Sequence, residues 1–160
     1  MIETAQKLRE TINKIVPLLE AINESETSNK PLPTKWSKKE ILGHLIDSAC
    51  NNQQKFVRMM DQPHLDFVGY EQDYWVATQA YNAYSWQELI NFWATYNRHI
   101  AHIIENVMPE TLQNTISIDG NGLYTLEFIM NDYVEHQLHH LKAILPKAGL
   151  ESKFQNVYGA

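Results

Sequence analysis

The sequence WSKKEILGHLIDSA, residues 36–49, combines a helix start with a histidine on the edge of an apolar stripe. Ser37 and Glu40 stand in the S-x-x-E pattern of a capping box, and Trp36 is placed as a possible hydrophobic staple. Apolar residues then recur at helical spacing as far as Met60. The stretch therefore predicts a helix from Ser37 to about Asp61 that carries His44 near its apolar face.

Three further segments repeat apolar residues at spacings of three and four, the period of an α-helix. They span residues 2–23, 85–107 and 125–145. Ser85 opens a second capping box, Thr125 is a plausible N-cap, and Pro146 ends the last helix. Pro17 lies inside the first helix and should kink or tighten it. Four helices of this length, each about 30 Å long, predict an all-α fold built as a four-helix bundle.

The connections between these helices differ in character. Residues 62–84 are rich in aromatic side chains, and a loop of this length is usually functional or contains short helices. Thr115–Ile118 alternates and could form a strand-like arm. We expect residues 1–146 to form the bundle domain and residues 147–160 to form a weakly ordered C-terminal tail. Phe154 and Tyr158 are the tail side chains that could pack back.

Composition limits the classes of function. The chain has 160 residues, enough for one domain with its own core. Its net charge of -6 argues against a nucleic acid or an anionic membrane as the main partner. The single cysteine, Cys50, excludes an internal disulfide. Apolar runs fall short of the roughly 20 residues that span a bilayer, so a cytoplasmic protein is predicted.

Histidine placement indicates the chemistry. His136 and His140 are at i and i+4, which puts them one above the other on one helix face. Two imidazoles at this spacing can bind one ion, as in the HExxH metal helices. A third ligand must come from another helix, and His44 is the best candidate. Three neutral imidazoles leave a coordination position open, as in catalytic zinc sites.

Other interpretations of the histidines stay open at this point. A pair at i and i+4 can also be surface decoration or a polar contact in the core. His99 and His102, at i and i+3, could make a rival cluster. A ferritin-like di-iron site is excluded, because that class needs Glu-x-x-His and no glutamate here lies three residues before a histidine. Cys50 is expected to be a small core residue rather than a ligand.

Three motifs together resemble the DinB/YfiT-like superfamily. The stretch from Trp36 to Ser48 is similar to the family's helix-two signature. Residues 70–76, YEQDYWV, look like its Y-x-Q-D-x-W-V loop, and residues 136–141, HQLHHL, resemble its last-helix H-x-x-H-H motif. The motifs occur in the family's order, and the resemblance covers about residues 5–146.

The resemblance implies a specific site and fold. The family's metal ligands correspond to His44, His136 and His140, and nickel and zinc are the metals such sites usually hold. The implied bundle follows an up-down-down-up course and is often a homodimer. Family members resemble metal-dependent hydrolases, and some relatives transfer low-molecular-weight thiols such as bacillithiol to small electrophilic substrates. The competing hypothesis is a metal-binding or structural module without turnover.

Several residues could assist such a site. Asp47 follows His44 by one helical turn and could hold an imidazole N–H or accept a proton. It could equally form an ion pair with a neighbouring helix. Tyr70, Asp73 and Tyr74 would wall the site and contact the substrate if the middle loop folds over it. For these side chains the alternative is ordinary packing.

Overall fold

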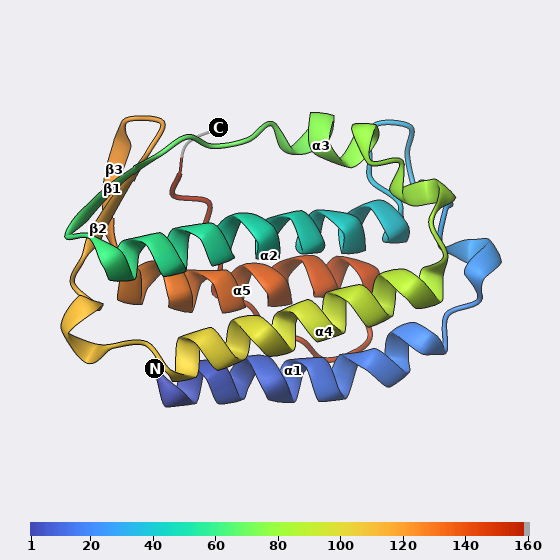
Figure 1. Cartoon of the computed structure of the whole chain (residues 1–160). Helices are drawn as coiled ribbons and strands as arrows, with labels where there is room; N and C mark the ends of the chain where they lie inside the picture. The colour runs from blue at the N-terminus through green and yellow to red at the C-terminus, as the bar shows by residue number, and fades with distance from the viewer. Residues whose placement is uncertain (159–160) are drawn as a thin grey trace.

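The computed structural model describes residues 1–158, and four long helices form its body (Figure 1). They are α1 (Ile2–Glu20), α2 (Lys38–Asp61), α4 (Trp86–Glu105) and α5 (Leu126–Ile144). Helices α1 and α5 run in one direction, and α2 and α4 run in the other (Figure 1). Helix α4 packs against both α1 and α2, while α5 packs against α2 and α1. The predicted four-helix bundle with an up-down-down-up course is confirmed.

The helix starts follow the predicted caps. Ser37 Oγ accepts a hydrogen bond from the Glu40 backbone N–H at 3.2 Å, and Glu40 Oε2 accepts one from the Ser37 N–H at 2.8 Å. The hydroxyls of Ser85 and Thr125 likewise accept backbone N–H groups at the starts of α4 and α5. Such caps satisfy amide groups that have no partner within the helix. Helix α1 ends at Glu20, slightly before the predicted Asn23.

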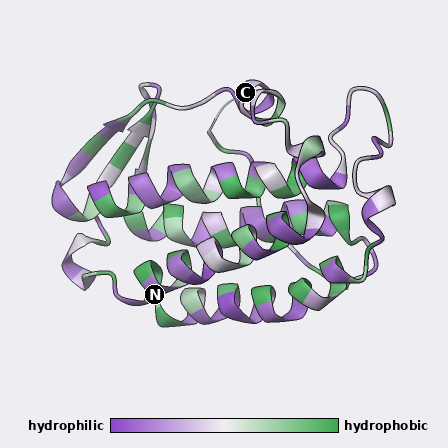
Figure 2. Cartoon of the chain, turned by 45° about the vertical axis from the view of Figure 1, so that its right-hand side comes forward, coloured by the Kyte–Doolittle hydropathy of each residue, from purple (hydrophilic) through white to green (hydrophobic). Residues whose placement is uncertain are grey.

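Apolar stripes of the four helices meet in one core, with the polar faces turned outward (Figure 2). Some of the polar groups at its centre are paired across the helices. The Trp93 indole N–H donates to Gln137 Oε1 at 2.9 Å, and the Tyr133 hydroxyl donates to Asn97 Oδ1 at 2.6 Å. Because buried polar groups are costly without partners, these bonds fix the depth and rotation of α5 against α4.

A three-stranded sheet lies at one end of the bundle, and the sequence predicts only its middle strand. Strand β2 (Thr115–Ile118) is the predicted arm, and β1 (His64–Phe67) and β3 (Asn121–Thr125) flank it. Strands β1 and β2 are parallel, with His64 opposite Thr115, while β2 and β3 are antiparallel. Asp119 and Gly120 have φ values of 51° and 74° in the hairpin turn, a conformation that glycine adopts at little cost.

The middle segment contains short helices, one of the two expected alternatives for a loop of this length. Helix α3 (Gln72–Thr78) is followed by a 3₁₀ turn at Tyr81–Ala83, and both pack against α2. Two other 3₁₀ turns lie at Glu24–Glu26 and Pro109–Thr111.

The described part of the C-terminal tail lies against the bundle, and Phe154 and Tyr158 pack back, as the sequence allowed. We call residues 150–158 the C-terminal strap. Ser152 Oγ donates to the Glu135 carbonyl at 2.8 Å, and the Lys153 N–H donates to Glu135 Oε2 at 2.7 Å. Further along, the Tyr158 hydroxyl donates to Asp132 Oδ2 at 2.6 Å. The strap therefore runs along α5; residues 159 and 160 lie outside the described part of the chain.

Within residues 1–158, every helix is too short or too polar to cross a membrane.

Candidate metal centre

Three histidines from two helices converge inside the bundle. His44 comes from α2, and His136 and His140 come from successive turns of α5. One ligand atom from each lies within 4.8 Å of the other two. Their ring centroids are 4.5 to 5.2 Å apart. The structure thus brings together the three predicted ligands, which the chain separates by up to 96 positions (140 minus 44).

The donor atoms fit a divalent transition ion. His44 Nε2 and His136 Nε2 face each other at 3.3 Å. Two nitrogens bound to one zinc at about 2.0–2.1 Å with tetrahedral angles lie about 3.3–3.4 Å apart. Three imidazole nitrogens are a donor set that zinc and nickel accept, whereas magnesium and calcium prefer oxygen. The three histidines therefore suit zinc or nickel better than magnesium or calcium.

Burial keeps these imidazoles neutral. It lowers the pKa of His44 to about 3 and that of His140 to about 4, with neighbouring histidines adding to the effect. The pKa of His136 is lowered well below its usual 6.5, again mainly by burial. A metal binds only the unprotonated nitrogen, so all three rings are in the binding form at neutral pH.

The second ring nitrogen, Nδ1, has a hydroxyl beside it in His136 but no hydrogen-bond partner in His44. His136 Nδ1 lies 3.4 Å from Ser48 Oγ, so with Nε2 free for a ligand the Nδ1–H donates to this hydroxyl. Such partners fix the tautomer and the ring orientation of a ligating histidine. His44 Nδ1 is buried and finds no hydrogen-bond partner among residues 1–158. Packing rather than hydrogen bonding therefore holds the His44 ring.

Two aromatic side chains cover the histidines. The Trp36 ring lies 4.9 Å from His44 and 6.5 Å from His140 between centroids. The Phe154 ring, from the C-terminal strap, lies 5.0 Å from His136. Apolar cover of this kind limits water access and strengthens electrostatic interactions inside the site.

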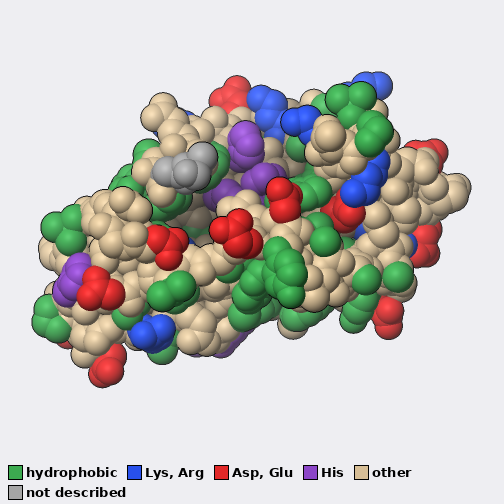
Figure 3. Space-filling model, turned by 90° about the horizontal axis from the view of Figure 1, so that it is seen from above, with side chains coloured by type: hydrophobic (Ala, Val, Ile, Leu, Met, Phe, Trp, Pro, Cys, Tyr) green, Lys and Arg blue, Asp and Glu red, His purple; other side chains and the backbone are tan. Residues whose placement is uncertain are grey.

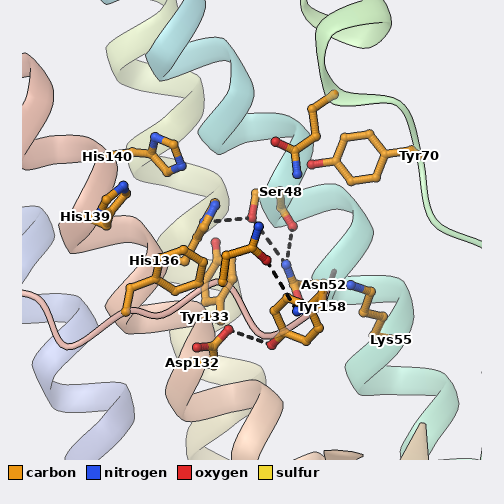
Figure 4. A pocket seen from close by; sticks show the side chains of 13 residues that line it. Ser48, Asn52, Lys55, Tyr70, Asp132, Tyr133, His136, His139, His140 and Tyr158 are labelled. Carbon is orange, nitrogen blue, oxygen red and sulfur yellow. Dashed lines mark hydrogen bonds between the residues drawn. The ribbon is translucent and has the colours of Figure 1, made fainter. Parts of the chain in front are cut away.

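A cavity of about 370 Å³ opens beside His136 and His140, and we call it the central cavity. Helices α2 and α5, Tyr70 and the C-terminal strap form its walls (Figure 4). From outside, histidine side chains are visible in a hollow of the surface (Figure 3). Its volume is within the range of small-molecule sites. A second cavity of about 440 Å³ lies on the other side of His140, beside Trp36.

The three residues of the middle segment that were predicted to wall the site lie in different places. Tyr70 lines the central cavity, and burial raises the pKa of its hydroxyl, which therefore stays protonated. Asp73 lines the second cavity instead. Tyr74 is 68% exposed and lines neither of the two. Substrate contact by these residues stays a prediction.

Asp47 is buried but points to the middle segment rather than to an imidazole. Its Oδ1 accepts hydrogen bonds from the Tyr81 hydroxyl at 2.6 Å and from Gln79 Nε2 at 2.7 Å. Gly43 permits this arrangement, since a Cβ there would lie 2.2 Å from the Tyr81 ring. A catalytic role for Asp47 stays a prediction, and its observed contacts position the turn after α3.

The remaining histidines lie outside the three-histidine group. His139 is exposed at the rim of the central cavity, with its ring 5.0 Å from that of His140. His99 and His102 are exposed on α4 and join no potential metal group among the described residues. Cys50, expected in the core, is exposed instead.

Sequence reasoning missed most of the central cavity's polar lining. Ser48, Asn52 and Lys55 follow His44 at intervals of four, four and three residues. This is the spacing of one helix face, so a polar stripe led by His44 was the available signal. The strap residues gave no such signal, because their position depends on contacts made after the last helix ends.

A model of the family described as the DinB superfamily matches residues 7–144. The solved structure of YfiT from Bacillus subtilis superposes with a TM-score of 0.80 at 17% sequence identity. The match covers 90% of this chain and 83% of that one, and YfiT is described as a probable metal-dependent hydrolase with an unusual four-helix bundle topology. No curated protein matched.

Proposed function

This chain belongs to the DinB superfamily, and on that premise we propose that it is a metal-dependent hydrolase. His44, His136 and His140 would hold the ion. The observation that carries the proposal is the convergence of three neutral imidazoles beside a cavity of small-molecule size. The description of YfiT as a probable metal-dependent hydrolase gives the reaction class.

The ligand count supports a reactive ion over a structural one. Structural zinc sites are normally closed by four protein ligands, whereas catalytic sites have three and keep one position open. Among residues 1–158, only three potential ligands converge at this point. His139 is the nearest further histidine, but it projects from the side of α5 and is exposed.

A divalent ion bound in such a site supplies Lewis acidity, which polarises a substrate carbonyl or phosphoryl oxygen and activates water. The surrounding residues of this chain create the conditions for that chemistry. Trp36 and Phe154 cover part of the imidazole surface, and Ser48 orients His136. The Tyr70 hydroxyl, protonated at neutral pH, can donate a hydrogen bond to a molecule in the central cavity.

Three finer points belong to the same proposal. The ion is nickel or zinc, which suits an all-nitrogen donor set. The protein works in the cytoplasm on a small molecule. It forms a homodimer, for which the exposed aromatic and aliphatic side chains Phe92, Tyr84 and Val57 offer apolar surface. Sedimentation of the purified protein tests the dimer, and a monomer at tens of micromolar would remove that point.

The experiment is a hydrolysis screen with and without metal. The purified protein is tested on small ester, amide and phosphoester substrates before chelation, after chelation and after metal is restored. We expect hydrolysis that disappears on chelation, returns with the metal and is lost in His136→Ala. The control His102→Ala, on exposed α4 surface, should behave as the parent.

Two outcomes would overturn the hydrolase proposal. Hydrolysis that is unaffected by metal removal would show that the ion is not needed. Consumption of electrophiles only in the presence of a low-molecular-weight thiol would reassign the site to thiol transfer, since a coordinated thiol is also activated by deprotonation.

A further inference from the structure

Two polar stripes face each other across the central cavity. On α2 the stripe that lines the cavity is Ser48, Asn52 and Lys55, which continues the helix face of His44, and on α5 it is Asp132, His136 and His140. Because α2 and α5 are antiparallel, the histidines gather at one end and Lys55 lies with Asp132 at the other (Figure 4). The cavity therefore has two chemically different ends.

Lys55 supplies a positive charge that no carboxylate of the described chain pairs with directly. Its ammonium lies 5.2 Å from the centre of the Phe67 ring and 5.9 Å from that of Tyr158. Within residues 1–158 it forms no ion pair at 4.0 Å or less. An ammonium has three N–H donors, and aromatic faces satisfy its charge only in part.

The carboxylates near Lys55 accept hydrogen bonds from other groups instead of pairing with its ammonium. Asp132 lies at the same end of the cavity, but its Oδ2 accepts the Tyr158 hydroxyl at 2.6 Å. Asp119 accepts the Gly69 backbone N–H at 2.9 Å. Both raise the pKa of Lys55 through space, yet burial outweighs them and lowers it to about 8. An ammonium with this pKa is mostly protonated at neutral pH and is further stabilised by an added anion.

We infer that the central cavity binds a small organic anion whose negative group is held by Lys55 while the rest of the molecule extends toward His136. This inference rests on the proposed function, because it names the substrate class of the same cavity. Lys55 is the one lysine or arginine in the lining, and the Tyr70 and Ser48 hydroxyls and the amides of Asn52, Gln72 and Asn156 are uncharged donors. Lys55 is therefore the residue that selects charge.

The dimensions limit the size of the anion. Lys55 is 11 positions beyond His44 on α2 (55 minus 44), a rise of about 16 Å between their Cα atoms. Helical side chains lean toward the helix N-terminus, so the ammonium is directed back toward the histidines. A molecule with a short carbon chain between its anionic group and its reactive group fits this span and the volume of about 370 Å³.

The test compares butyrate with butyramide, its neutral isostere. Each is titrated into ¹⁵N-labelled protein as purified, with metal content measured on the same sample, and the affinity is read from the amide shifts of Asn52 and Lys55. We expect butyrate to bind at this end of the cavity, and Lys55→Gln to weaken it at least tenfold, the usual effect of losing a charge-assisted hydrogen bond. Butyramide affinity should change little.

Four further variants act as controls. Lys55→Arg keeps the charge and should retain most of the butyrate affinity, and Lys14→Gln, on exposed α1 surface, should behave as the parent. Asp132→Asn should strengthen butyrate binding, because it removes a competing carboxylate. Lys55→Met preserves the aliphatic packing and replaces Lys55→Gln if that variant does not fold.

The results separate this inference from the proposed function. Unchanged butyrate affinity in Lys55→Gln, or no shift of Asn52 and Lys55 with butyrate, would overturn the anion subsite whatever the metal content. Protein that takes up no metal even when supplemented, yet still binds butyrate through Lys55, would support the subsite and count against the hydrolase. Weaker butyrate binding in Asp132→Asn would show that Asp132 supports the bound molecule rather than competing with it, and would overturn the assignment of Lys55 as the residue that selects charge.

Discussion

His44 Nε2 and His136 Nε2 lie 3.3 Å apart although the residues are 92 positions apart in the chain. Since both rings are neutral, at most one of these two facing nitrogens carries a hydrogen. This separation equals the distance between two nitrogens bound to one tetrahedral zinc ion. His140 completes the group of three nitrogen donors.

Ser48 should tune the affinity for the ion without being a ligand. In Ser48→Ala the Nδ1–H of His136 loses the hydroxyl 3.4 Å away, so the ring is held less firmly. Loss of such a partner typically costs about 10–100-fold in metal affinity, and the length of this contact favours the lower figure. Competition with a chromophoric chelator measures the change. Ser25→Ala, on an exposed turn, is the matched control, and equal affinity in both variants would refute the role.

Phe154 should slow the escape of the ion. Its ring covers His136 from the C-terminal strap at 5.0 Å, so Phe154→Ala should open the site to water and to chelators. We expect metal to be stripped by EDTA several-fold faster than from the parent, with stoichiometry before treatment unchanged. Phe92→Ala removes a ring from the surface of α4 and should leave the rate alone. Identical stripping in the two variants would mean that the strap does not protect the site.

Gly43→Ala should destabilise the fold through one contact. The new Cβ would lie 2.2 Å from Tyr81 Cδ2, so the ring must move away from α2. Overpacking of this kind costs about 1–3 kcal/mol of unfolding free energy. Chemical denaturation measures it, and the cost should shrink in a Tyr81→Leu background, where the ring is absent. A cost that persists there would place the strain elsewhere.

Asp47 gives a pH dependence of stability. Burial raises its folded-state pKa above the usual 3.8, although the Tyr81 and Gln79 hydrogen bonds oppose the shift. A carboxyl with a raised pKa favours the folded state when protonated, and this contribution is lost as pH rises through the raised pKa. Asp47→Asn keeps an oxygen for both donors but never ionises. It should match the parent below about pH 3.8 and become the more stable of the two at neutral pH.

The same variant tests the catalytic prediction for Asp47. If the carboxylate only positions the turn after α3, Asp47→Asn should keep its metal and most of its hydrolysis. Hydrolysis that is lost while metal is retained would instead make Asp47 a participant in the reaction.

Local signals in the sequence predicted the elements that depend on local chemistry. The hydroxyls of Ser37, Ser85 and Thr125 mark three helix starts because each caps an N-terminus within its own turn. The i, i+4 spacing of His136 and His140 predicts a shared face for the same reason. His44 lies on another helix. Its prediction as the third ligand rested on its position beside the apolar stripe and on the family resemblance.

Elements that depend on distant partners were not predictable in this way. Strand β1 is four residues long and is held by parallel pairing with β2, about 50 positions later in the chain. The strap lies against α5 through Glu135 and Asp132, whose carboxylates carry no sequence signal for it. Lys55 was missed because a lysine on a helix is usually solvated, and only its register with His44 places it in the cavity.

The most direct test of the account is the metal content of the purified protein and of four histidine variants by elemental analysis. The account predicts one nickel or zinc per chain in the parent and in His139→Ala, and almost none in His44→Ala, His136→Ala or His140→Ala, with all variants folded by circular dichroism. Metal that is absent from the metal-supplemented parent, or that His139→Ala removes as completely as His136→Ala, would contradict an open site built by His44, His136 and His140.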